Sequence, residues 1–244
     1  MGKRLIQQRR GRGTQRYRFP GFNAQGEIRH VNTDKTVQGK VTDIIRCIAH
    51  SAPLAEVVLA QNGEFGLNTQ NEKTLIIAPE NVKVGDVLEF NSNNLANGNV
   101  MKLKDIPEGA AIYNIELQPG DGGKIVRSAG TSARIIFKSE KYVSVILPSK
   151  KVKNFSIYCR ANIGTISGGG FNEKPLYKAG NKYRKRHTKG KLYPNVSAQS
   201  MNAVDHPFGG SSSAHKGHPT IAGRFAPPGA KVGKIHPKRT GKKR

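Results

Sequence analysis

The sequence has no tryptophan and only two cysteines, and its acidic residues are scarce. Sixteen Asp and Glu stand against 41 Lys and Arg, a formal net charge of +25 in 244 residues. No apolar run approaches the length of a membrane span, and the basic N-terminus lacks the apolar segment of a secretory signal. We therefore expect no membrane partner.

The two cysteines, Cys47 and Cys159, lie far apart in apolar surroundings, and the sequence has no CxxC pair. We expect two buried free thiols in a reducing cytosol. A structural zinc site built on cysteines is excluded, because such a site needs paired ligands.

The excess positive charge indicates a polyanionic partner, since a charge of this size opposes compaction and attracts phosphate. Residues 1–35 hold nine Lys and Arg against two acids, residues 36–173 hold fifteen against thirteen, and residues 174–244 hold seventeen against one. We predict a basic N-terminal extension (1–35), a nearly neutral body and a basic C-terminal extension (174–244).

Both extensions are rich in Gly, Pro, Ser and Asn, so they cannot bury enough apolar area to fold alone. On a phosphate backbone, each Lys or Arg can displace counterions and the segment can become ordered. The alternative is a solubilising tail, which rarely needs one sign of charge at this density. Tyrosines among the basic residues offer stacking faces for unpaired bases, although one or two of them could instead pack onto the body. These are Tyr17, Tyr177, Tyr183 and Tyr193.

The body consists of short stretches of β-forming residues separated by turn signals, without a convincing long amphipathic helix. Strands of this length and spacing are typical of small antiparallel barrels. The polar stretch 91–109 resembles a joint, so we predict an all-β fold with two small β-barrels in series, 36–100 and 101–173. The expected strands are 41–49, 54–60, 74–78, 86–90, 110–117, 124–129, 133–138, 142–148 and 156–161.

One hairpin is predicted in detail. ARIIFK (133–138) and YVSVILP (142–148) are joined by three residues. In the second strand Val143, Val145 and Leu147 alternate with Tyr142, Ser144 and Ile146, so one face is expected to be buried.

The stretch SMNAVDHPFGG (200–210) resembles an active-site loop because it contains an Asp-His pair. Neighbours in an extended segment point to opposite sides, so Asp205 is badly placed to orient His206 as a catalytic base. We interpret the stretch as a rigid turn, in which Pro207 fixes φ and Gly209-Gly210 let the backbone pass close to another surface. Ser211, Ser212 and Ser213 are candidate nucleophiles only by proximity.

Other motifs for chemistry are weak. Gly122-Gly123-Lys124 is followed by Ile125, so it lacks the hydroxyl of a phosphate-binding loop. His215 and His218 could share a metal only if their loop turned tightly, and no second pair lies at ligand spacing. We expect neither a metal nor a cofactor.

The sequence resembles a known family in several segments. SMNAVDHPFGG (200–210) and RFAPPGAKVGKI (224–235) resemble the universal large-subunit ribosomal protein of the L-two family. MGKRLIQQRRGRG at the start, RANIGTISGGG (160–170) and KAGNKYRKRH (178–187) are similar to its archaeal and eukaryotic-cytosolic branch. There are departures: Ser211 stands where the family usually has a third glycine, and Ala203 and Phe208 differ from the Pro and His of bacterial members.

The resemblance implies an oligonucleotide-binding-type barrel followed by an SH3-like barrel, flanked by basic extensions that thread into ribosomal RNA. It implies primary binding of large-subunit ribosomal RNA in the cytoplasmic ribosome, with roles in subunit association, tRNA binding and the peptidyl-transferase region. Partners would be that RNA, neighbouring ribosomal proteins and the small subunit, as an intersubunit bridge. His206 is the family's D-H-P histidine and is carried over as an RNA-contact or positioning residue.

We therefore predict a structural RNA-binding protein without catalytic residues. One alternative is a histidine-dependent acyl-transfer enzyme built on Asp205, His206 and His215. The other is a free-standing, non-specific nucleic-acid binder, to which long arms on a neutral body are poorly suited. The predicted RNA-binding residues are Arg9, Arg10, Arg12, Arg16, Arg18, Lys182, Arg184, Lys185, Arg186, His187, Asn202, Asp205, His206, Gly209, Gly210, Arg224, Lys231 and Lys234.

Overall fold

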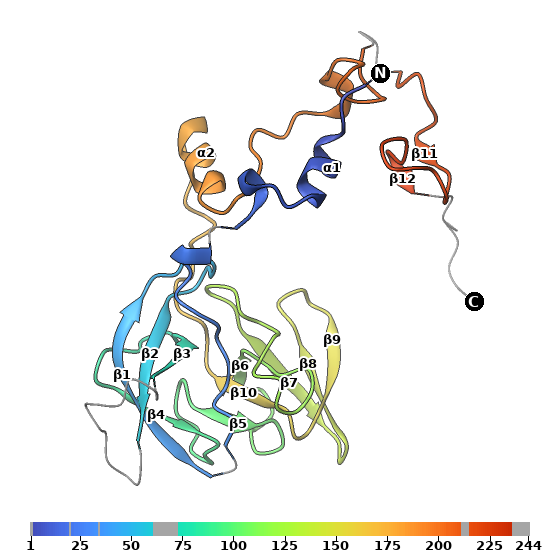
Figure 1. Cartoon of the computed structure of the whole chain (residues 1–244). Coiled ribbons are helices and arrows are strands. Elements are labelled where there is room, and N and C mark those ends of the chain that lie inside the picture. The colour runs from blue at the N-terminus through green and yellow to red at the C-terminus, as the bar shows by residue number, and fades with distance from the viewer. Residues whose placement is uncertain (1, 20, 34, 61–72, 211–214, 236–244) are drawn as a thin grey trace. The chain divides into compact units, whose positions relative to one another are not determined.

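The structure is a computed structural model of the chain and describes residues 2–19, 21–33, 35–60, 73–210 and 215–235. It divides into two compact units (Figure 1). One, the body, is Gly21–Pro175. The other, the basic unit, combines both ends of the chain, Met1–Pro20 and Leu176–Arg244.

The first half of the body is an antiparallel sheet in the order β3-β2-β1-β4. A register shift between Val41 and Asp43 bends the long strand β1 where it pairs with β2. Gly39 lies at a close approach of side chains, where a Cβ would meet Phe90 at 2.8 Å. The strands are β1 (Val37–Ile45), β2 (Leu54–Leu59), β3 (Lys73–Ile77) and β4 (Val87–Phe90).

The second half continues the same hydrogen-bonded sheet in the order β5-β10-β6-β7-β8-β9, and a short parallel pairing of Phe90 with Val100 joins the halves. Figure 1 shows β1 to β4 on one side of the body and β6 to β9 on the other. The strands are β5 (Val100–Lys102), β6 (Ala111–Tyr113), β7 (Ala133–Lys138), β8 (Tyr142–Ile146), β9 (Val152–Ser156) and β10 (Arg160–Ile163).

Each half encloses its own group of buried side chains. In the first half Val41, Val57 and Phe90 pack together, and in the second half Ile112, Val143 and Phe155 do so. A third cluster around Tyr113 and Ile166 joins residues from both halves. Two separate cores beside one shared cluster agree with an all-β fold of OB-like and SH3-like halves, and the predicted fold class is confirmed. The domain boundaries at residues 35, 100 and 173 stay predictions.

Several predicted strands are confirmed, most clearly the hairpin of β7 and β8. Arg134 pairs with Ile146 and Lys138 with Val143, while Val143 and Val145 are fully buried. Both cysteines are buried free thiols as expected, and burial raises the pKa of Cys159 to about 11.

Other strand predictions are wrong. Residues 124–129 form no strand and make only the isolated bridge Ile115–Ile125. The predicted strand 156–161 is interrupted by a turn at 157–158 that separates β9 from β10. The stretch 91–109, predicted to be a joint, contains β5. Val100 and Met101 in this strand are fully buried despite their polar neighbours in the sequence.

The two arms of the basic unit are not extended throughout, because they contain short helices and one short pair of strands. The two helices contain no buried residue, so they are not stabilised by a packed apolar face. Two short parallel strands pair Ile221 with Lys234 and Ala222 with Ile235. Its elements are α1 (Ile6–Gly11), α2 (Ala179–His187), β11 (Ile221–Ala222), β12 (Lys234–Ile235) and the 3-10 helices Gln15–Tyr17 and Ala198–Ser200.

Candidate nucleic-acid interface

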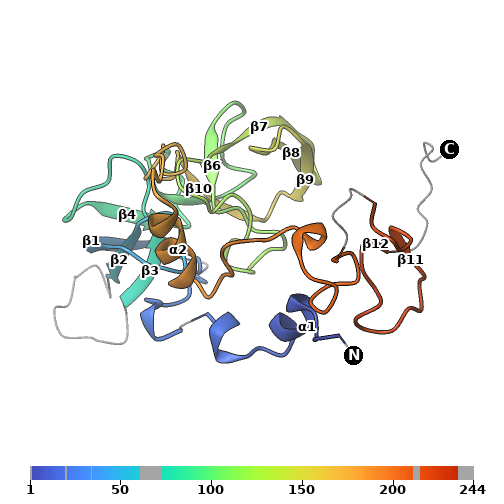
Figure 2. The same ribbon diagram turned by 90° about the horizontal axis from the view of Figure 1, so that it is seen from above.

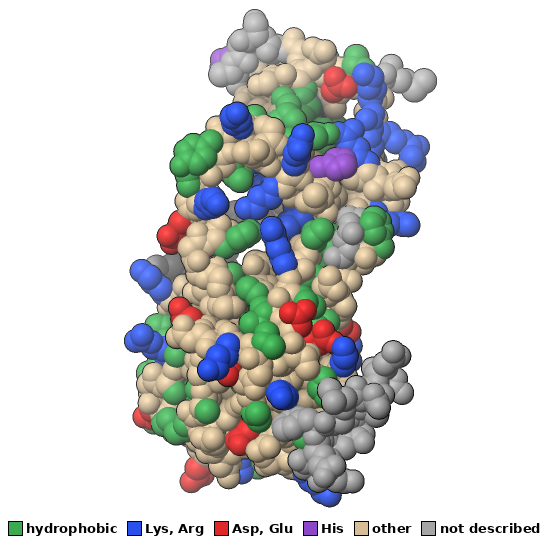
Figure 3. Space-filling view, turned by 90° about the vertical axis from the view of Figure 1, so that its left-hand side faces the viewer, with side chains coloured by type: hydrophobic (Ala, Val, Ile, Leu, Met, Phe, Trp, Pro, Cys, Tyr) green, Lys and Arg blue, Asp and Glu red, His purple; other side chains and the backbone are tan. Residues whose placement is uncertain are grey.

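Positive charge is concentrated in the basic unit. Its sequence contains 23 Lys and Arg and one acid, Asp205, whereas the body contains 18 Lys and Arg and 15 acids. Figure 3 shows Lys and Arg side chains gathered over the upper part of the view, where acidic side chains are few. A surface of one sign and this density attracts a polyanion over distances of about a Debye length, roughly 8–10 Å at physiological salt.

Helix α1 presents the arginines of the N-terminal arm. Its sequence IQQRRG consists mainly of good helix formers, and the Gln8 Oε1 accepts a 2.9 Å hydrogen bond from the Leu5 backbone N–H at the helix start. Arg9 and Arg10 lie in the last turn, where cations are favoured by the helix dipole, and Arg12 follows as the C-cap. All three side chains are exposed.

Helix α2 presents the densest run of basic residues in the second arm. Arg184, Lys185, Arg186 and His187 occupy its last turn, and Lys182 lies one turn earlier. Nine residues are too few to form a stable helix without outside contacts, and adjacent like charges weaken it further. The helix therefore exposes its charge where a phosphate backbone would stabilise it.

The two arms meet along part of their length. The Lys3 backbone N–H donates to the Val204 carbonyl at 2.8 Å, and α1 lies beside the 190–206 segment in both Figure 1 and Figure 2. Arg16, Arg18 and His187, predicted separately, line one cavity of about 520 Å³. The sequence alone did not predict that these residues would be brought together.

Aromatic rings interleave with these cations. Tyr183 stacks on His187 with ring centroids 5.8 Å apart, and the Lys182 Nζ lies 5.5 Å from the centre of the Tyr193 ring. Tyr177 is 89% exposed and offers a free face. Exposed or cation-covered rings of this kind are stacking platforms for unpaired bases.

The 202–210 loop is a tight turn, as the sequence predicted. The backbone N–H groups of Asp205 and His206 both donate to the Asn202 carbonyl, at 2.9 and 3.2 Å. A Cβ at Gly209 would meet the Asn202 carbonyl oxygen at 2.6 Å, and Gly210 has φ +92°. The glycines therefore allow the loop to fold against its own backbone, whereas we expected an approach to another surface.

The Asp-His pair in this loop is not arranged for catalysis. The Asp205 Oδ1 pairs with the Lys3 Nζ at 3.4 Å, and the His206 Nδ1 accepts a 3.0 Å hydrogen bond from the Phe208 backbone N–H. Desolvation lowers the pKa of His206, which favours the neutral ring with its proton on Nε2. The candidate nucleophiles Ser211, Ser212 and Ser213 lie outside the described residues.

The remaining predicted residues lie in the C-terminal segment. The Lys231 Nζ donates to the Arg224 carbonyl at 2.8 Å, which ties the turn between them, and Lys234 lies in β12 with its side chain exposed. Sequence reasoning missed two aromatic residues here. Phe225 is 91% exposed beneath the Arg224 guanidinium, and Phe208 is 6% exposed and anchors the 202–210 loop. The adjacency of Arg224 and Phe225 was the available signal for the first.

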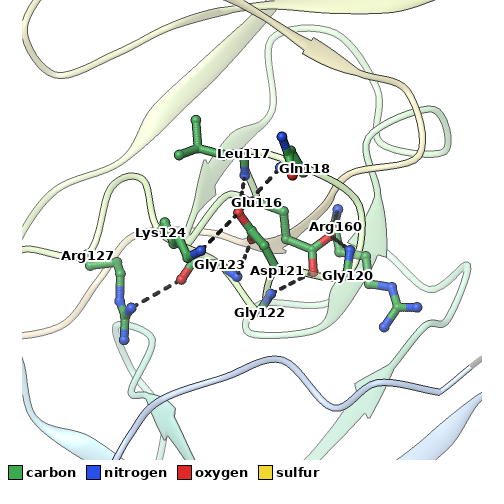
Figure 4. A network of polar contacts seen from close by, with 10 residues as sticks. All are labelled: Glu116, Leu117, Gln118, Gly120, Asp121, Gly122, Gly123, Lys124, Arg127 and Arg160. Carbon is green, nitrogen blue, oxygen red and sulfur yellow. Dashed lines mark hydrogen bonds and ion pairs between the residues drawn. The ribbon is translucent and has the colours of Figure 1, made fainter.

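The body contributes a loop held by a buried carboxylate, which the sequence did not indicate (Figure 4). Glu116 is 1% exposed, and its carboxylate accepts hydrogen bonds from the backbone N–H groups of Gly120, Gly122 and Arg160. The Asp121 Oδ2 accepts from the Leu117 and Gln118 N–H groups, so the 117–123 loop is held at both ends.

Within the described ranges, no three His, Cys, Asp or Glu side chains converge as a metal site would require. The helices that the structure describes are all too short or too polar to cross a bilayer.

Comparison with known proteins yields one family. Residues 96–228 match the family model described as Ribosomal Proteins L2, C-terminal domain. The chain is 46% identical to the large ribosomal subunit protein uL2 of Methanobrevibacter smithii, over 100% of both chains. It is 44% identical to the protein of the same name from Natronomonas pharaonis, over 99% of this chain and 97% of the relative. The Haloarcula marismortui protein is also 44% identical, over 99% and 98% of the two chains.

Proposed function

The chain belongs to the L-two family of large-subunit ribosomal proteins, and we propose that it is a structural constituent of that subunit which binds ribosomal RNA mainly through its basic unit. One observation carries the RNA-binding assignment: 23 Lys and Arg against a single acid in the unit formed by the two ends of the chain. The protein is then located in the cytoplasm, as part of the ribosome.

The mechanism is charge neutralisation by groups fixed in place. Each Lys or Arg that meets a phosphate releases a condensed counterion, so RNA segments that repel one another can be joined through the protein. The exposed arginines of α1 and the last turn of α2 supply the charge, and Tyr177 and Tyr183 supply stacking faces. The nearly neutral body would dock by shape, because it has little net charge to offer.

The finer roles are proposals that rest on family membership. We propose that the protein supports subunit association, tRNA binding and the peptidyl-transferase region, and that it contacts neighbouring ribosomal proteins. A contact with the small subunit as an intersubunit bridge belongs to the same proposal.

We assign no catalytic role to the chain. In the described loop the Asp205 carboxylate is paired with Lys3, and the Nδ1 of His206 is occupied by the Phe208 N–H. A serine-type mechanism needs this nitrogen protonated and directed at an acid. The RNA-binding residues named from the sequence remain predictions for the same interface.

The direct test is binding of the full chain to deproteinised large-subunit ribosomal RNA, with small-subunit ribosomal RNA as competitor, over a salt series. We expect preference for the large-subunit RNA and a steep fall in affinity with salt. Equal binding to both RNAs would instead support the free-standing, non-specific binder.

A further inference from the structure

The basic unit has almost no apolar core of its own. Among its described residues, only Phe208 and Ala222 are buried hydrophobic side chains. Apolar side chains are instead partly exposed around a cavity of about 540 Å³ that both arms enclose. They come from three segments: Leu5 and Ile6 from the start of α1, Leu192, Val196, Ala198 and Met201 from the second arm, and Val232 near the end of the chain.

Leaving these side chains partly exposed around a cavity is unfavourable, because each exposed apolar group forgoes the free energy of burial. A volume of 540 Å³ falls within the range of roughly 300–1,000 Å³ that small-molecule sites occupy. The cavity is therefore large enough for a flat heterocycle and is lined as such a site requires.

The polar lining of the cavity shows which kind of apolar ligand it suits. Arg10 and Lys231 line it, from α1 and from the C-terminal segment, and both side chains are exposed. Its one carboxylate, Asp205, is already paired with Lys3. The lining thus combines apolar walls with positive charge that the single carboxylate does not offset.

We propose that this cavity binds one unstacked nucleobase of large-subunit ribosomal RNA, with adjoining phosphates on Arg10 and Lys231. The inference rests on the proposed function and names a base-binding subsite within that interface. An apolar peptide segment could pack against the same walls, but it would bring no negative charge to Arg10 and Lys231. A nucleotide brings both, a flat apolar face and a phosphate.

His206 adds a polar contact within the same cavity. Its Nδ1 accepts the Phe208 N–H, so the neutral ring carries its proton on Nε2 and can donate a hydrogen bond. Ring nitrogens and carbonyl oxygens of bases are the acceptors that such a donor meets. The side chain acts here as a positioning contact for the base.

The test uses the full chain, deproteinised large-subunit ribosomal RNA and base-specific chemical probing at single-nucleotide resolution, beside hydroxyl-radical footprinting of the backbone. Ala198→Phe fills the cavity without changing charge. Ala230→Phe is the matched control, since Ala230 is exposed in the same unit and does not line the cavity. Ile6→Ala removes a wall while placing the best helix former in α1.

We expect the wild-type protein to protect at least one unpaired base that becomes reactive again with Ala198→Phe, while the backbone footprint is retained. The affinity should fall about tenfold or more, as for loss of one stacked base, and Ile6→Ala should weaken binding several-fold. The slope of affinity against salt should stay unchanged, because no phosphate contact is removed. Ala230→Phe should behave as wild type.

An identical base-protection pattern for wild type, Ala198→Phe and Ile6→Ala would overturn the nucleobase site, and a side chain of a neighbouring protein would then be the better occupant. Failure of the wild-type protein to bind this RNA at all would overturn the proposed function and the site with it. The two failures are distinguishable because the wild-type protein still binds the RNA in the first case and does not bind it in the second.

Discussion

At the scale of single residues, one determinant of the fold has no recognisable pattern in the sequence. Glu116 looks like any acid in a strand, yet its carboxylate is buried and accepts three backbone N–H groups. Such a role depends on where the chain places the donors, which come from residues 4, 6 and 44 positions away. The glycines of the 117–123 loop are ordinary turn residues, but nothing in the sequence marks the carboxylate that holds the loop.

Glu116→Gln should destabilise the body, because one carboxylate oxygen becomes an NH2 group facing a backbone donor. Leaving a buried donor unsatisfied costs about 1–3 kcal/mol. Thermal unfolding followed by tyrosine fluorescence or circular dichroism would measure this loss. Glu140→Gln is the matched control on an exposed carboxylate and should lie within about 0.5 kcal/mol of wild type. Equal stabilities of the two variants would contradict the role assigned to Glu116.

His30 should make stability pH-dependent. Burial lowers the pKa of His30 below its ordinary value of 6.5, and its Nε2 lies 2.7 Å from the Asn114 carbonyl as a donor. The hydrogen bond to Asn114 and the charge of Glu116 oppose this lowering of the pKa, whereas Arg160 and Arg127 add to it. The unfolded chain takes up the proton first as pH falls, so the free energy of unfolding should decrease from about pH 7 to pH 5.

Unfolding of wild type and His30→Gln across this interval checks the prediction. Glutamine can donate to the same carbonyl but does not titrate, so its stability should depend less on pH. His50, whose pKa is also lowered by burial, keeps part of the dependence in both proteins. Identical pH profiles for the two proteins would show that His30 is not the source.

At the scale of elements, strands were easier to predict than helices. The hairpin of β7 and β8 has alternation that matches its buried face, so its pairing and that face could be predicted. Helix α2 has no apolar face and no buried residue, so no 3.6-residue period could mark it. Its sequence only indicated RNA contact, through its charge. The sequence also could not predict that Arg16, Arg18 and His187 line one cavity, because no local pattern links two segments so far apart in the chain.

Changing Arg184, Lys185 and Arg186 together to Ala should reduce the salt dependence of RNA binding. Each lost phosphate contact lowers the slope of log affinity against log salt by roughly 0.7–0.9. Alanine raises helix propensity, so a structural loss would not explain the change. Binding measured at several salt concentrations gives the slope. The control variant changes the exposed body residues Lys141, Lys151 and Lys153 to Ala and should alter the slope less. An unchanged slope for the α2 variant would show that these three side chains do not contact phosphates.

At the scale of the whole molecule, the uneven charge distribution is the property that the sequence predicted best. The neutral body, the basic ends and the all-β class all follow from counting residues and following their periodicity. The structure adds that both ends of the chain belong to one unit. The long-range pairing of residues 3 and 204 has no local pattern, because it depends on a backbone hydrogen bond and an adjacent ion pair.

The central claim is that the protein is an integral part of the large ribosomal subunit. Sedimentation of a gently lysed cell extract, before and after a high-salt wash, tests it most directly. We predict that the protein travels with the large subunit and resists the wash, because many fixed cations and stacked bases would have to be released together. A protein that stays at the top of the gradient, or that leaves the subunit at modest salt, would contradict the account.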